Sequence, residues 1–104
     1  MSGIYGNSLL YLWVMKKLVF KFLDIRFRGV NLGYDVYDMS DVRTEHYYRK
    51  GGAPIIEIKN FHNERGFRYR VNKVLYRDLK GYFDLHDLVI DSYVHEWCRD
   101  KTRK

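Results

Sequence analysis

Residues 54–76 carry the sequence pattern that most constrains the fold of this chain. The first part is a short, mainly apolar run, Ile55-Ile56-Glu57-Ile58-Lys59, and the last part is the alternating run Phe67-Arg68-Tyr69-Arg70-Val71-Asn72. Between them lies Asn63-Glu64-Arg65-Gly66, which contains turn-forming residues. Alternation of apolar and polar residues with a period of two is typical of a strand with one buried face and one solvated face. Two such runs around a glycine-containing loop predict a β-hairpin, which we expect to extend to Tyr76.

Further strands are predicted before this hairpin. In residues 23–28, apolar Leu23, Ile25 and Phe27 alternate with charged neighbours, which indicates a strand. A turn over residues 29–33 leads to a second short strand over residues 34–37. Residues 40–50 allow two interpretations, a helix capped by Ser40 and closed by Gly51, or a strand favoured by its β-branched and aromatic residues.

Helices are predicted at both ends of the chain. Asn7 or Ser8 can cap a helix whose following residues are apolar on nearly every side, and Asp84 can cap the last helix. We expect Asp87, Asp91 and His95 on the outer side of that last helix. Its predicted inner stripe consists of Leu85, Leu88, Val89, Ser92, Tyr93 and Trp97.

These elements predict an α+β fold. It is a small antiparallel sheet of three to five strands, with a C-terminal helix and an N-terminal helix packed on it. At 104 residues, the chain is expected to form a single domain over residues 1–104. Met15-Lys16-Lys17 resembles an ordinary protein start, which would make residues 1–14 a dispensable extension.

The charge of the chain favours acidic partners. The formal net charge is +6, and residues 1–77 hold 14 basic and 7 acidic residues, whereas residues 78–100 hold 2 basic and 6 acidic ones. The predicted sheet is therefore cationic and the last helix anionic. We expect an acidic protein surface or a nucleic acid as the partner, and self-association is compatible with the sequence.

Cysteine content and hydropathy indicate a cytoplasmic protein with no membrane partner. Cys98 is the single cysteine, so no disulfide can form within the chain, and a reducing compartment is expected. Lys16, Lys17 and Lys21 interrupt the apolar N-terminal run before it is long enough to span a bilayer.

A basic face of the predicted sheet is the first candidate binding site. If the strands lie side by side with matching faces, their arginines and lysine form a patch suited to phosphates or carboxylates. This patch would include Arg26, Arg28, Lys59, Arg68, Arg70 and Asn72.

A metal-dependent nuclease is the alternative. Glu57-Ile58-Lys59, preceded by Asp38, resembles the core of the PD-(D/E)xK nucleases. The resemblance implies that Asp38 and Glu57 hold Mg²⁺, which activates water against a phosphodiester, while Lys59 stabilises the developing charge. Mg²⁺ is implied only by this interpretation, and otherwise no cofactor or metal is expected.

In general character, the chain is similar to small phage-encoded proteins that bind and inhibit a host protein. The similarity rests on size, basic charge and tyrosine-rich runs such as His46-Tyr47-Tyr48-Arg49-Lys50 and Tyr93-Val94-His95-Glu96-Trp97. It implies an inhibitor that covers a functional surface of a host replication, transcription or defence protein. We therefore predict a non-enzymatic binding protein. The alternative is a basic nucleic-acid-binding domain or a minimal PD-(D/E)xK-like, Mg²⁺-dependent nuclease.

Overall fold

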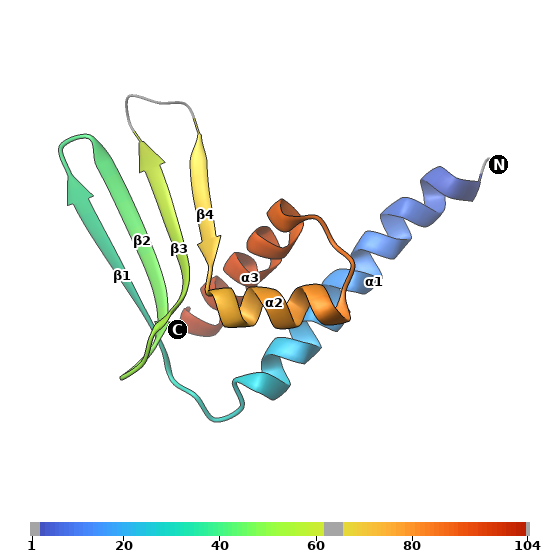
Figure 1. Ribbon diagram of the computed structural model, residues 1–104, viewed down its shortest axis with the longest axis horizontal. Coiled ribbons are helices and arrows are strands. Elements are labelled where there is room, and N and C mark those ends of the chain that lie inside the picture. Colours follow the sequence, from blue (N-terminus) through green and yellow to red (C-terminus); the bar gives the residue numbers. More distant parts are fainter. Residues whose placement is uncertain (1–2, 62–65, 104) are drawn as a thin grey trace.

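A computed structural model describes residues 3–61 and 66–103, and shows a four-stranded antiparallel sheet with three helices (Figure 1). The strand order is β1-β2-β3-β4. This arrangement confirms the predicted α+β fold. In chain order the elements are α1 (Gly3–Arg26), β1 (Leu32–Met39), β2 (Val42–Arg49), β3 (Pro54–Phe61), β4 (Phe67–Val71), α2 (Lys73–Tyr82) and α3 (Asp87–Thr102).

The hairpin predicted over residues 54–76 is formed by β3 and β4, but its second strand is shorter than expected. Ile58 pairs with Tyr69 and Lys59 with Arg68. The strand ends at Val71, because the side-chain oxygen of Asn72 accepts hydrogen bonds from the backbone nitrogens at positions 74 and 75, at 3.0 and 3.4 Å. Asn72 thus caps α2, and residues 73–76 are helical rather than extended.

A bulge explains why two consecutive isoleucines of β3 are both buried. Tyr47 of β2 pairs with Ile56, but the next residue, Tyr48, pairs with Pro54. Ile55 is therefore the extra residue on β3, and it breaks the alternation of faces. Ile55 and Ile56 are 3% and 0% exposed, respectively. The bulge lets the core gain a side chain that strict alternation would place in solvent.

The strand predicted over residues 23–28 is wrong, because this segment is the end of α1. Val19 and Leu23 lie four residues apart and are both fully buried, which is the spacing of one helix face. Ile25, which the strand interpretation places beside Leu23, is 58% exposed. Residues 42–49 of the ambiguous segment form β2, so the strand interpretation of residues 40–50 is confirmed.

Helix α3 joins the two layers of the fold, because it packs on the sheet and on α1. Tyr47 of β2 lies against His95 of α3, while the Trp97 indole nitrogen donates to Asp24 of α1 at 2.9 Å. The buried residues of α3 are Ile90, Asp91, Val94, Trp97 and Cys98.

Two sequence predictions for α3 are therefore corrected. The N-cap is His86 rather than Asp84, and its ring nitrogen accepts from the backbone nitrogen of Leu88 at 3.2 Å. Leu88 is 64% exposed, whereas Asp91 is only 9% exposed. Because α3 contacts two neighbours, its buried sector is wider than one stripe and is rotated toward Asp91.

The N-terminal half of α1 extends away from the rest of the fold (Figure 1). Every side chain from Leu9 to Val14 is at least 39% exposed, whereas Val19 and Leu23 further along α1 are fully buried. Across residues 3–61 and 66–103, no helix has both the length and the apolar content to cross a bilayer.

A chain that begins at Met15 is expected to fold, because it keeps Val19 and Leu23, which are fully buried. The truncation removes the hydrogen bond from the Tyr93 hydroxyl to the Leu12 carbonyl oxygen, 3.0 Å long. Loss of one such bond costs about 1 kcal/mol. Urea denaturation should therefore show a cooperative transition close to that of the full chain. An insoluble or non-cooperative product would show that residues 1–14 belong to the folding unit.

Candidate binding surface on the open sheet face

The two faces of the sheet have different surroundings. One face packs against α3 through side chains that include Tyr47, Ile56, Ile58 and Val71, and we call it the inner face. Because side chains alternate along a strand, the neighbours of these residues point the other way. We call that other side the open face. Its central residues are Asp35, Tyr37, Thr44, His46, Tyr48, Glu57, Lys59, Arg68 and Arg70.

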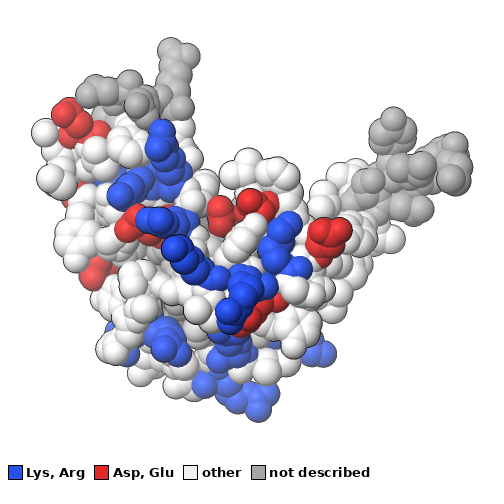
Figure 2. Space-filling view, in the orientation of Figure 1, with Lys and Arg blue, Asp and Glu red and all other residues white. Residues whose placement is uncertain are grey.

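Three of the predicted basic residues come together on the open face. Lys59 of β3 is the direct cross-strand partner of Arg68, and Arg70 follows two residues later on β4. Figure 2 shows lysine and arginine side chains in a band along the β3–β4 side of the sheet, toward α2. The Arg68 guanidinium also lies 5.4 Å from the centre of the Phe61 ring. These strands therefore present a rigid basic surface.

An acidic residue lies within this basic surface. Glu57 is the cross-strand partner of both Arg70 and His46, and its carboxylate is 2.8 Å from His46 Nε2. The same carboxylate is 3.6 Å from Lys59 Nζ. The edge of the His46 ring also meets Tyr37, with ring centres 5.5 Å apart. Glu57 thus contacts both His46, at hydrogen-bond distance, and Lys59, as an ion pair.

His46 is a site residue that the sequence interpretation missed. It lies within a tyrosine-rich run, and nothing in that run indicates which residue of another strand it faces. The pairing with Glu57 depends on the register between β2 and β3. A single sequence contains little information about such registers, so this contact was not predictable.

At the β1 edge of the open face, an aromatic ring lies over the backbone. A Cβ atom on Gly33 would lie only 2.5 Å from the Tyr48 ring, so this ring covers the glycine. A hydrogen bond between Tyr48 and Asp35 raises the pKa of the tyrosine. The β1 side of the open face therefore carries an acidic and aromatic pair, whereas the β4 side is basic.

The residues of the nuclease interpretation are divided between the two faces. Asp38 is the cross-strand partner of Arg43, in a row that belongs to the inner face. Glu57 and Lys59 lie on the open face. Within residues 3–61 and 66–103, no group of three histidine, cysteine, aspartate or glutamate side chains is placed to hold a metal ion. This arrangement does not bring Asp38, Glu57 and Lys59 to one phosphate.

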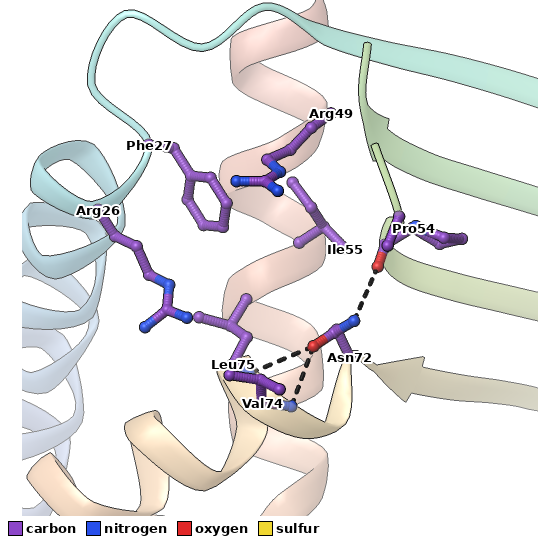
Figure 3. Close-up of a pocket in the computed structure, with 9 residues that line it drawn as sticks. Arg26, Phe27, Arg49, Pro54, Ile55, Asn72, Val74 and Leu75 are labelled. Carbon is purple, nitrogen blue, oxygen red and sulfur yellow. Dashed lines mark hydrogen bonds between the residues drawn. The ribbon is translucent and has the colours of Figure 1, made fainter. Parts of the chain in front are cut away.

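The other predicted basic residues lie near the end of α1, away from the open face. Arg26 lines a cavity of about 270 Å³, together with Arg49 and Asn72 (Figure 3). Arg26 also forms an ion pair with Asp78 of α2. Asn72 is occupied in capping α2, and its amide also donates to the Pro54 carbonyl oxygen at 3.4 Å. Arg28 follows α1 and is exposed. The predicted six-residue patch is thus split into two groups.

Comparison with models of known families, with curated proteins and with solved structures finds no match.

Proposed function

We propose that this protein is a non-enzymatic binding protein that uses its open sheet face to cover an acidic surface of a partner protein. The observation that carries the proposal is the placement of Lys59, Arg68 and Arg70 on two neighbouring strands. The sheet fixes the backbone of these residues, so binding costs less backbone entropy here than it would on a loop. An inhibitor of the small phage-encoded type would act in this way, by occupying a surface that its host target needs.

The mixture of charges favours a protein over a nucleic acid as the partner. Glu57 lies between the basic residues and His46, and Asp35 lies at the far side of the same row. A duplex presents closely spaced phosphates, which two carboxylates on this face would repel. A protein surface can instead offer carboxylates opposite the arginines and basic groups opposite the acids. Arginine suits this role, because its guanidinium binds a carboxylate through two parallel hydrogen bonds.

The single cysteine supports a reducing compartment such as the cytoplasm for this activity. Cys98 is fully buried in α3, and burial raises the pKa of its thiol to about 12. The thiolate is the reactive form of cysteine, so this side chain has a packing role.

Replacing Arg68 and Arg70 together by glutamate is expected to weaken partner binding at least about tenfold, because each charged hydrogen bond contributes about 1.5–3 kcal/mol. Both side chains are exposed, so the fold should be retained. The test is a pull-down from a bacterial lysate with the tagged wild-type chain, followed by titration of the purified partner with each variant.

A matched control is the pair Lys21→Glu and Arg28→Glu. It makes the same change in net charge at exposed positions away from the open face. This control should keep nearly full affinity. If both double variants lose affinity equally, net charge rather than the open face governs binding. Binding to duplex DNA that decreases steeply with salt, without a protein partner, would contradict the proposal in favour of the nucleic-acid alternative.

A further inference from the structure

A second hollow lies on the inner face, at the end of the sheet that α3 leaves uncovered. It has a volume of about 500 Å³, within the range of small-molecule sites. Glu45 lies at its floor on β2 above the buried Ile58 of β3, and the last two turns of α3 form one wall. Phe67 of β4 and Tyr34 of β1 stand at its two sides. We call this hollow the aromatic groove.

Two of the aromatic rings that line this groove remain accessible. Phe67 is 57% exposed and Tyr34 is 39% exposed. Tyr34 is stacked on Tyr47 with ring centres 4.6 Å apart, and Phe67 lies beside Tyr69 with ring centres 6.2 Å apart. Because β1 and β4 are separated by two strands, the backbones that carry Tyr34 and Phe67 belong to strands about 14 Å apart.

His95 of α3 links the two aromatic sides, and its surroundings favour the neutral imidazole. Its ring centre lies 5.4 Å from that of Tyr47 and 5.9 Å from that of Tyr69. Burial, and then the nearby Arg99 charge, lowers the pKa of His95. Burial also raises the pKa of Tyr47 to about 12. The back of the groove is therefore uncharged and suited to a flat, weakly polar ring.

Charged groups occupy separate parts of the groove. Arg99 and Arg103 come from the end of α3, and both are exposed. Glu45 lies on the floor, and one of its oxygens accepts a hydrogen bond from the Tyr34 hydroxyl. Its other oxygen can accept from a second donor, because a carboxylate has several acceptor positions. The groove thus offers two cations at its mouth and one acceptor at its floor.

We propose that the aromatic groove binds a nucleoside monophosphate unit, with the base against Phe67 and the phosphate at Arg99 and Arg103. Exposed aromatic side chains bind bases by stacking, which needs no particular base. Two guanidinium groups match the charge and geometry of a phosphate. Glu45 is placed to accept from a ring or amino N–H of the base, as carboxylates do with the amino groups of bases. The unit can be a free nucleotide or one nucleotide of a single strand, because both present this chemistry.

Isothermal titration calorimetry of the full chain tests the proposal. AMP and GMP are titrated beside adenosine, inorganic phosphate and a short single-stranded oligoadenylate. We expect AMP or GMP to bind with a dissociation constant between about 1 μM and 1 mM. Adenosine and phosphate should each bind at least about tenfold more weakly, since each lacks one half of the recognised unit. If the natural ligand is a free nucleotide, AMP should bind more tightly than the oligonucleotide. If it is a single strand, the oligonucleotide should bind more tightly than AMP.

Two variants locate the ligand. Phe67→Ala should weaken binding by roughly 5- to 100-fold, as loss of one base–aromatic stack does. Arg99→Gln with Arg103→Gln should reduce the affinity for AMP toward that for adenosine. The matched control is Arg68→Gln with Arg70→Gln, which removes two charges from the same strand as Phe67, but on the open face. This control should bind AMP as the wild type does.

The proposal is overturned if neither nucleotide nor oligonucleotide binds at about 10 mM, beyond the weak end of ordinary ligand affinities. It is also overturned if both groove variants bind as well as the wild type. The groove and the open face are on opposite sides of the sheet, so the two proposals fail separately. The Arg68 and Arg70 variants should lose partner binding but keep nucleotide binding. The groove variants should lose nucleotide binding but keep partner binding.

Discussion

Replacing Trp97 by alanine is expected to destabilise the fold by about 3–5 kcal/mol, which is a large part of the free energy of unfolding of a chain this size. Trp97 is 3% exposed and its ring centre lies 5.4 Å from that of Phe27. Its indole nitrogen donates to Asp24, so the side chain joins α3 to α1 both by packing and by a hydrogen bond. Urea denaturation followed by circular dichroism measures the loss.

Trp97→Phe separates the two contributions. Phenylalanine keeps most of the packing against Phe27 but cannot donate to Asp24, so this variant should lose about 1–3 kcal/mol. A Trp97→Ala protein that melts within a few degrees of the wild type would contradict the role of Trp97 in the core. The only other tryptophan in the sequence, Trp13, is 56% exposed. In a Trp13→Phe chain that keeps Trp97, the tryptophan fluorescence therefore reports on Trp97 alone.

The burial of Trp97 was predictable, but the full buried sector of α3 was not. A helix that packs on one neighbour buries one stripe, and residues three and four apart reveal it. Helix α3 instead meets both the sheet and α1, so Ile90 and Val94 are fully buried although they lie outside the predicted stripe. Leu88, which belongs to the predicted stripe, is exposed. The spacing of residues along α3 does not indicate where the second neighbour lies.

The candidate binding surface was also predictable only in part. Alternation within β4 placed Arg68 and Arg70 on one face, because the period of two is a local property of the chain. The addition of Lys59 followed from the predicted hairpin of β3 and β4. Arg26 was assigned wrongly, because residues 23–28 fit a strand pattern and a helix pattern equally well. The contact between His46 and Glu57 required the register of two strands, which depends on the whole sheet.

The wide buried sector of α3 includes Asp91, and the burial of this carboxyl group leads to a prediction about the pH dependence of stability. Asp91 is 9% exposed, and burial, with the charge of Asp87 one turn earlier, raises the pKa of Asp91 to about 6. A hydrogen bond from Tyr76 lowers the pKa of Asp87, so that neighbour stays charged over most of the pH range. An unfolded aspartate ionises near pH 4. Between about pH 4 and 6, the folded protein therefore holds a proton that the unfolded chain releases.

This difference in proton binding fixes the sign of the pH effect. Where the folded state binds more protons, the free energy of unfolding decreases as pH rises. Asp91 therefore lowers stability progressively from about pH 4 to 6, and the loss is complete above its folded pKa. A shift of this size corresponds to about 1–3 kcal/mol. Asp91→Asn is expected to be more stable than the wild type by that amount at pH 7.5.

Urea denaturation of both proteins across pH 3.5–7.5 tests the prediction, since other carboxyl groups titrate alike in the two and cancel in the difference. The advantage of Asp91→Asn should decrease as pH falls through 6 and disappear near pH 4, where Asp91 is protonated in both states. Asp100→Asn is the matched control, because Asp100 lies on the same helix with half of its side chain exposed. A constant difference across this range would mean that Asp91 is ionised in the fold, with its charge balanced by a neighbouring group. A lower stability of Asp91→Asn at pH 7.5 would likewise contradict the expected sign, because removing a costly buried charge should raise the free energy of unfolding.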